Sequence, residues 1–260
     1  MPFRPTLPLL KPKSASSKNW ISRQARDPYV KQRATDPALY RSRSAFKLIE
    51  LDQKYGGFLS KSDVSAIVDL GAAPGGWSQV AARKLGFNAL EEDAQDGFST
   101  LRRANDKIII AVDLLRMDPI PGVEIIQANM LSLRTAGVIK SLLTGPGNPE
   151  GKADIILSDM AANMTGNKIA DSESSLDICN AVFTFAKGHL RTAESVGRRR
   201  AGVLVLKHFA HPLMNEFRKE HLDSTFTDVM YVKPDSSRAS SSEGYWVCMG
   251  WKGLQGAEGA

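Results

Sequence analysis

The chain has 260 residues, 42% of them apolar, which is enough for one large α/β domain or two small ones. No apolar run is long enough to cross a bilayer, and we expect no membrane insertion. Two cysteines, Cys179 and Cys248, and four histidines argue against a disulfide framework and a structural zinc site, so we expect no metal.

The positive charge of the protein is concentrated at its N-terminus. Residues 1–47 contain eleven Lys and Arg against two Asp and Glu, a net charge of +9, whereas the rest of the chain has a net charge of −3. A basic field of this kind attracts phosphate backbones or anionic membranes. The alternative is a solvated tail, which we favour for residues 1–13 alone.

The first 26 residues contain six basic residues, no acidic residue and a small polar run at 14–17. This composition is typical of a mitochondrial presequence. Against it, four prolines would break an amphipathic helix, at positions Pro2, Pro5, Pro8 and Pro12. We predict a flexible basic segment over 1–17, one domain with a basic N-terminal extension over 18–253, and a flexible tail over 254–260. We expect a mitochondrial location, with a cytoplasmic or nucleolar one as the alternative.

Residues 20–35 mix aromatic and basic groups, which suits contact with RNA. The segment 41–51, RSRSAFKLIEL, then predicts a helix that ends at Gly56-Gly57. Lys47 lies at the edge of its apolar face, where surface charge is the simpler interpretation. We predict seven RNA-contacting residues: Lys18, Arg23, Arg26, Lys31, Arg33, Arg41 and Arg43.

The segment 66–79, AIVDLGAAPGGWSQ, predicts a strand, a glycine-rich loop and a helix over about 77–85. Glycines let the backbone approach a ligand, and a helix N-terminus offers free N–H groups. The spacing is not G-x-G-x-x-G, which argues against a dinucleotide. A small ligand with an adenosine and a carboxylate fits better.

Further strands are predicted at 108–112, 124–127, 154–157, 202–206, 226–232 and 245–249. The helices between them are predicted at 131–143, 173–190 and 212–222, and 86–106 is interpreted as a surface insertion. Strands that alternate with helices predict a parallel, doubly wound sheet.

Polar residues lie at the carboxyl ends of five predicted strands, at the edge where such a sheet binds its ligand. They are Asp69 to Gly71, Asp113, Asn129, Asp159 and Lys207. An antiparallel last strand would bring Glu243 to the same edge. Lys207 directly follows an apolar run, so we expect it either to be paired with a carboxylate or to be neutral.

Several motifs resemble those of the FtsJ/RrmJ-type ribosomal RNA ribose 2′-O-methyltransferases. They are RSRSAFKL, DLGAAPGGWSQ, SDMAANMTG, the Lys-ended strand VLVLK, and KPDSSRAS followed by Glu243 and Tyr245. The resemblance covers about residues 14–251. It implies S-adenosylmethionine as methyl donor, S-adenosylhomocysteine as product, and a Rossmann-like, mostly parallel seven-stranded sheet with an antiparallel last strand and helices on both faces.

Carried over residue by residue, the resemblance places a catalytic tetrad on Lys47, Asp159, Lys207 and Glu243. The cofactor-binding set is Asp69, Gly71, Pro74, Gly75, Gly76, Trp77, Asp113, Leu114, Asn129, Met130 and Asp159. Three departures from the family pattern are Asn129 in place of Asp, Ala162 in place of Pro, and the 86–106 insertion. Together with the acid-free N-terminus, the insertion favours the mitochondrial, fungal-type branch.

The expected reaction is 2′-O-methylation of a uridine ribose in large-subunit, mitochondrial rRNA, by a monomer that acts on an assembling ribosomal particle. In this hypothesis Lys207 takes the hydroxyl proton or stabilises the oxyanion, and Asp159 positions Lys207. Lys47 and Glu243 orient the ribose. The alternatives are a tRNA or cap ribose methyltransferase, or a non-catalytic RNA-binding assembly factor.

Overall fold

The structure is a computed structural model that describes residue 22 and residues 26–87, 107–162 and 168–254. Lys18, Arg23 and most of the expected 86–106 insertion lie outside the described residues. Residue contacts divide the chain into two units, Met1–Leu39 and Tyr40–Ala260, which we describe separately. The domain boundary expected at residue 18 stays a prediction.

The first unit contains helix α2, Pro28–Thr35. Asp27 caps it: its carboxylate accepts hydrogen bonds from the backbone N–H groups of Tyr29 at 3.1 Å and Val30 at 3.4 Å. Pro28 occupies the first helical position, where no backbone N–H is needed.

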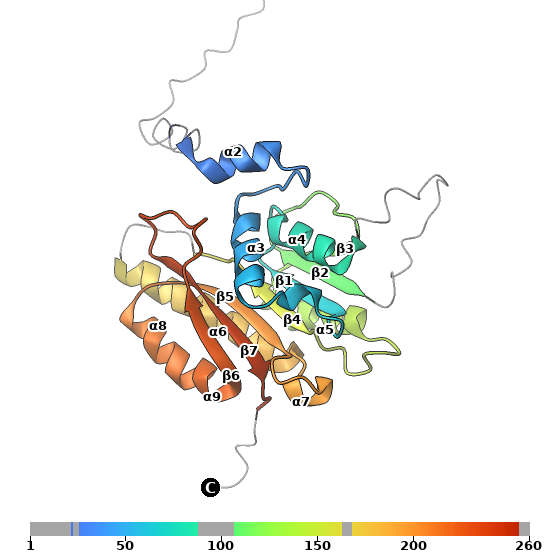
Figure 1. The fold of residues 1–260 in the computed structure, drawn as a ribbon. Helices are drawn as coiled ribbons and strands as arrows, with labels where there is room; N and C mark the ends of the chain where they lie inside the picture. Colours follow the sequence, from blue (N-terminus) through green and yellow to red (C-terminus); the bar gives the residue numbers. More distant parts are fainter. Residues whose placement is uncertain (1–21, 23–25, 88–106, 163–167, 255–260) are drawn as a thin grey trace, which may run out of the picture. The chain divides into compact units, whose positions relative to one another are not determined.

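The second unit is built on a seven-stranded sheet with the order β3-β2-β1-β4-β5-β7-β6 (Figure 1). The strands are β1 (Ala66–Leu70), β2 (Ile108–Asp113), β3 (Val123–Gln127), β4 (Ile155–Ser158), β5 (Val203–Phe209), β6 (Phe226–Val232) and β7 (Glu243–Trp251). Pairs from β3 to β5 are parallel, and β7 runs antiparallel to both β5 and β6. The predicted fold class is confirmed.

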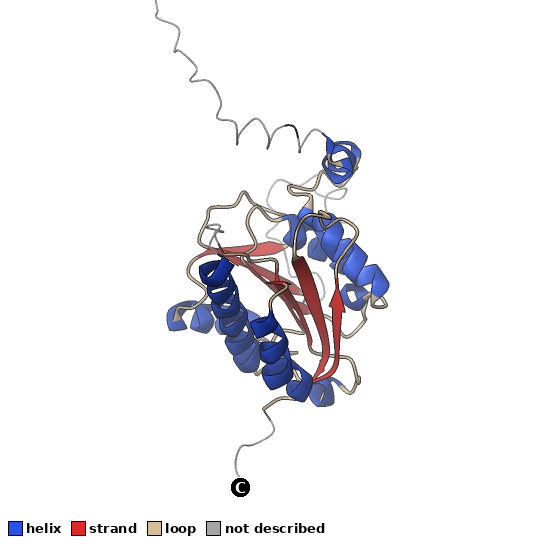
Figure 2. Ribbon diagram, turned by 90° about the vertical axis from the view of Figure 1, so that its left-hand side faces the viewer, coloured by secondary structure: helices blue, strands red, loops and turns tan. Residues whose placement is uncertain are grey.

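Helices cover both faces of this sheet (Figure 2). The elements are α3 (Ser44–Lys54), α4 (Gly76–Leu85), α5 (Leu133–Leu143), α6 (Lys168–His189), α7 (Ala193–Val196), α8 (Pro212–Phe217) and α9 (Asp223–Thr225), with a 3₁₀ turn η1 (Phe58–Ser60) and a π-helical turn η4 (Arg218–Leu222). None of the helices in the described ranges is both long and apolar enough to cross a membrane.

Strand alternation assigns the helices to their faces. Val68 and Leu70 of β1 belong to the main core, together with Ile139 of α5 and Cys179 of α6. Asp69 points to the opposite face, because neighbouring strand residues alternate, and it bonds a serine of α4. The α3–α4 layer therefore lies on the face to which Asp69 points.

Two strands extend further toward the carboxyl edge than the sequence predicts. Strand β5 continues through Lys207 to Phe209, and β7 begins at Glu243. These ends pair with each other, with Phe209 opposite Glu243. Pairing with a distant strand therefore keeps residues in β5 that lie beyond its apolar run. Lys207 is thus a strand residue with a fixed direction rather than the first residue of a loop.

The chain order of the strands reverses between β1 and β4. From β1 the chain builds β2 and β3 on one side, then crosses to β4 and β5 on the other. Ligands of open α/β sheets bind at this point, beyond the carboxyl ends of the strands. The glycine loop follows β1 and Asp159 follows β4, so both border this crevice.

Candidate active site

The glycine loop after β1 lies directly against the segment after β4. Gly71 has φ +70°, and a Cβ built there would lie 2.0 Å from Cγ of Met160. Gly75, at φ +108°, forms the N-cap of α4. Only glycine combines these left-handed conformations with the close approach, so the loop can bring main chain and a helix N-terminus to the crevice.

Neighbouring elements brace the loop through its main chain. Asp113, at the end of β2, accepts the Ala73 N–H at 2.8 Å on one carboxylate oxygen and the Leu115 N–H at 2.7 Å on the other. Each oxygen keeps a second lone pair, so Asp113 remains able to accept a ribose hydroxyl. The indole N–H of Trp77 donates to the Ser44 carbonyl at 2.8 Å, which ties α4 to α3.

Asp69 lies beneath this loop and is almost fully buried, with 1% of its surface exposed. Ser78 donates a hydrogen bond to its Oδ2 at 2.6 Å. Burial raises the pKa of Asp69 to about 7, because desolvation and the nearby carboxylates of Asp159 and Asp113 outweigh the Ser78 hydrogen bond. Asp69 therefore titrates near neutral pH.

The enclosed part of the crevice is small, with a volume of about 40 Å³. It is lined by Ser44, Asp69, Gly71, Ala72, Ala73, Trp77 and Asp159. It lies between the glycine loop and Asp159.

Exposed residues follow β2 and β3 at the same edge of the sheet. Leu114, directly after β2, is 67% exposed. Asn129, after β3, is also exposed, and its Oδ1 accepts the Leu131 N–H at 2.9 Å while keeping a second lone pair. The residues after β1, β2, β3 and β4 thus offer polar groups of the kind that could hold S-adenosylmethionine, and the contacts expected from Asp113, Leu114, Asn129 and Asp159 stay a prediction.

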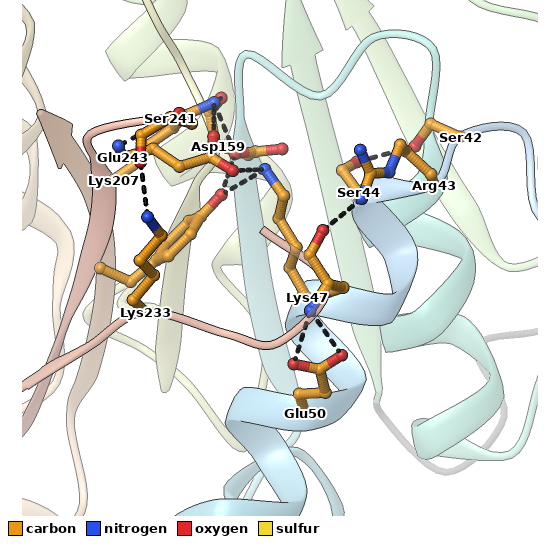
Figure 3. Close-up of polar contacts among 12 residues, drawn as sticks. Ser42, Arg43, Ser44, Lys47, Glu50, Asp159, Lys207, Lys233, Ser241 and Glu243 are labelled. Atoms are coloured by element: carbon orange, nitrogen blue, oxygen red, sulfur yellow. Dashed lines mark hydrogen bonds and ion pairs between the residues drawn. The ribbon is translucent and has the colours of Figure 1, made fainter. Parts of the chain in front are cut away.

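The four charged residues of the predicted tetrad come together beside the loop (Figure 3). Lys47 of α3 lies 2.8 Å from Glu243 of β7, measured from Nζ to Oε1. The Nζ of Lys207 lies 3.0 Å from Oδ1 of Asp159 and 3.6 Å from Oε2 of Glu243. Two ammonium and two carboxylate groups thus form one continuous chain of ion pairs.

Strand register explains why these residues meet. Lys207 of β5 lies opposite Tyr245 of β7, and directly paired strand residues point to the same face. Both therefore point toward the α3–α4 layer, where Lys47, only 7% exposed, approaches from α3. An ammonium so deeply buried requires the carboxylate partner that Glu243 provides.

Tyr245 joins the two halves of the cluster, a role that sequence reasoning missed. Its hydroxyl donates to Oδ1 of Asp159 at 2.6 Å and accepts from Nζ of Lys47 at 3.1 Å. Burial and the two nearby carboxylates raise the pKa of Tyr245 well above its ordinary value, so the hydroxyl keeps its proton. Its place two residues after Glu243, and hence on the same face of the strand, was the available signal.

The electrostatics of Glu243 follow from its two lysine neighbours. Burial alone would raise its pKa, but Lys47 first and Lys207 second outweigh burial, and the pKa of Glu243 is lowered. Glu243 is thus a carboxylate at neutral pH, although only 8% of its surface is exposed.

The seven residues predicted to contact RNA are distributed over both units. Arg26, Lys31 and Arg33 belong to the first unit. Arg41 donates to the carbonyls of Asp118 at 2.6 Å and Pro119 at 2.5 Å, and Arg43 donates to the Ser236 carbonyl. Both arginines therefore brace main chain around the site, and their contact with RNA stays a prediction. In the described ranges, no three His, Cys, Asp or Glu side chains gather as a metal site.

The fold and the site together define a methyltransferase with a Rossmann-like sheet. The model of the FtsJ-like methyltransferases matches residues 40–251, and the chain belongs to this family. It is 39% identical to ribosomal RNA large subunit methyltransferase E of Rhodopseudomonas palustris (strain HaA2), over 93% of this chain and 88% of that protein.

Further similarities agree with this assignment. The protein of the same name from Magnetococcus marinus is 37% identical over 92% of this chain and 97% of its own length. The crystal structure of a protein described as a ribosomal RNA methyltransferase, from Plasmodium falciparum, matches with a TM-score of 0.61 and 30% identity. That match covers 82% of this chain and 100% of the other.

Proposed function

We propose that the protein transfers a methyl group from S-adenosylmethionine to the 2′-hydroxyl of a uridine ribose in large-subunit ribosomal RNA. The observation that carries this proposal is the ion-pair chain of Lys47, Glu243, Lys207 and Asp159, which ends beside the loop that fits the cofactor. The names of the bacterial relatives support large-subunit rRNA as the substrate.

S-adenosylmethionine supplies an electrophilic methyl group on a sulfonium centre. The protein must therefore align the ribose oxygen with that methyl group and manage the hydroxyl proton. Lys207 is the residue placed for this task, because its Nζ borders both the methyl-side carboxylate Asp159 and the ribose-side carboxylate Glu243.

Lys207 acts on the hydroxyl oxygen in one of two ways. A neutral Lys207 accepts the proton as a general base, whereas a charged Lys207 stabilises the oxyanion that develops when the proton leaves. Asp159 holds Lys207 in position in both cases. Lys47 and Glu243, paired at 2.8 Å, orient the ribose from the other side.

The test is methyl transfer by Lys207→Ala. We expect its rate on large-subunit rRNA or on ribosomal particles from cells lacking the protein to fall by at least about 100-fold. Its affinity for S-adenosylmethionine should remain that of the wild type. The matched control is Lys219→Ala, which removes an exposed lysine from η4 and should retain full activity. Wild-type turnover by Lys207→Ala would contradict the assigned role.

The substrate and the compartment need a separate experiment. We propose mitochondrial large-subunit rRNA, supported by the six basic residues and the absence of acidic ones in residues 1–26. Mapping ribose methylation at nucleotide resolution in mitochondrial and cytoplasmic rRNA, with and without the protein, tests this. One uridine in mitochondrial rRNA should lose its methyl group. A lost site in cytoplasmic rRNA, tRNA or an mRNA cap would instead support an alternative location or substrate.

RNA binding is proposed to involve the basic residues of the segment 18–47. Binding through phosphate contacts falls steeply as salt increases. We therefore expect affinity for large-subunit rRNA to drop by about tenfold or more between 50 and 200 mM salt. An affinity insensitive to salt would contradict this interface.

A further inference from the structure

The connection between β6 and β7, residues 233–242, carries the chain to Glu243 and is bound to α3 at Ser236. The Ser236 N–H donates to both carboxylate oxygens of Glu50, at 3.1 and 3.2 Å. The Ser236 carbonyl accepts from the guanidinium of Arg43. Glu50 of α3 and Arg43, the N-cap residue of α3, thus bind both main-chain groups of Ser236. Figure 3 shows the two side chains.

This contact is polar rather than a packed apolar interface. Beside it, the residues of α3 around Glu50 and the first residues of the connection line a cavity of about 380 Å³. Ser236 itself is fully buried, with 0% of its surface exposed. The hydrogen bonds to Glu50 and Arg43 therefore satisfy both main-chain groups of a buried residue, and breaking one of them leaves a buried polar group unsatisfied.

Two hydrogen bonds within the connection link it to Glu243. Lys233 donates to the Ser241 carbonyl at 2.6 Å and so closes the connection on itself. The Glu243 N–H donates to the Ser241 hydroxyl at 3.2 Å. Movement at Ser236 would therefore displace Ser241 and Glu243, and with Glu243 the 2.8 Å ion pair to Lys47.

We propose that Glu50 is a positioning residue for methyl transfer: by binding the Ser236 main chain it holds Glu243 against Lys47. Glu50 is one helical turn from Lys47 on α3, so the same helix supplies the ammonium and fixes its carboxylate partner. This inference rests on the proposed function, in which the Lys47–Glu243 pair orients the ribose.

The test compares Glu50→Ala with Glu50→Gln and with a matched control, Gln53→Ala. Gln53 is exposed, lies on the same helix and lines the same cavity, but its side chain does not bond the connection. The first measurement is hydrogen–deuterium exchange of peptides covering 233–243, which requires neither cofactor nor RNA. Exchange should rise about tenfold in Glu50→Ala and remain at the wild-type level in Gln53→Ala.

The second measurement is single-turnover methyl transfer across pH. Glu50→Ala should react about tenfold more slowly with unchanged S-adenosylmethionine affinity, since only the ribose side of the site is displaced. The acid side of the pH–rate profile of Glu50→Ala should also move to higher pH. The reason is that Glu243 loses contact with the Lys47 ammonium, which lowers the pKa of Glu243. Glu50→Gln, whose amide oxygen still accepts the Ser236 N–H, should recover part of both effects.

The proposal is overturned if Glu50→Ala matches Gln53→Ala in exchange, in rate and in the acid side of the pH–rate profile. If Glu50→Ala does not fold, Glu50→Gln against Gln53→Ala decides by the same measurements. Wild-type protein that does not methylate rRNA would refute the proposed function. The exchange of 233–243 would still establish or overturn the attachment by Glu50.

Discussion

The buried carboxyl of Asp69 makes the stability of the protein depend on pH in an unusual direction. Its pKa is raised from 3.8 to about 7 by burial, so the folded state holds this proton more tightly than the unfolded state. The contribution of Asp69 to the free energy of unfolding is therefore largest at low pH. It falls as pH rises from the unfolded pKa to the folded one. A shift of this size corresponds to about 4 kcal/mol, at about 1.4 kcal/mol per pH unit.

The substitution Asp69→Asn removes this titration while keeping an oxygen that accepts from Ser78. Urea unfolding without cofactor, followed by tryptophan fluorescence from pH 4 to 8, measures the free energy of unfolding of both proteins. We expect the variant to gain about 4 kcal/mol relative to wild type between these two pH values.

The comparison must be made between the two proteins at each pH rather than on wild type alone. Burial lowers the pKa of His208 from 6.5 to about 4, and this group contributes stability that increases with pH over the same range. The His208 contribution is the same in both proteins and cancels in the difference. Parallel stability curves for wild type and Asp69→Asn would refute the assignment of a raised pKa to Asp69.

Two further substitutions test the ion-pair chain. Tyr245→Phe removes the hydroxyl that donates to Asp159, so methyl transfer measured in single turnover should slow by about two- to tenfold, with cofactor affinity unchanged; a loss of more than about 1,000-fold would instead make the hydroxyl essential. Lys47→Met leaves Glu243 with only Lys207, at 3.6 Å, and should lower the free energy of unfolding at pH 7 by about 3 kcal/mol. Wild-type Glu243, with its lowered pKa, contributes stability that is lost as pH falls below about 4.5, and this acid-side loss should disappear in Lys47→Met. Equal unfolding curves at pH 7 would contradict the assigned pairing.

Much of the α/β order follows from local pattern alone. Apolar runs such as 66–70 and 203–206 can be buried on both sides only as central strands, and the glycines at 71 and 75 accept conformations that other residues avoid. The carboxyl ends of parallel strands share one edge, so Asp159 and Lys207 could be placed together before any contact was known.

Other features depended on contacts between distant segments. The extension of β5 to Phe209 rests on pairing with β7, and the sequence around Lys207 contains no periodic signal for it. Likewise, Arg41 and Arg43 lie in a basic segment typical of RNA contact, but their guanidinium groups bind carbonyls more than 70 residues away. Which carbonyl comes within reach of a long side chain is a property of the packed fold.

The sequence by itself determined the class of fold, the glycine loop and the polar strand ends at Asp159 and Lys207, because each depends on periodicity, glycine conformation or a strand end. Lys47 and its place in the tetrad came from the family resemblance, since the pattern alone favoured surface charge. Only the tertiary structure decided how these charges pair. It placed Tyr245 between Asp159 and Lys47, and it brought Glu50 to the main chain of Ser236. The physical reason is that hydrogen bonds act over about 3 Å. Partners separated by many residues meet at that distance only after strand register and helix packing have been established.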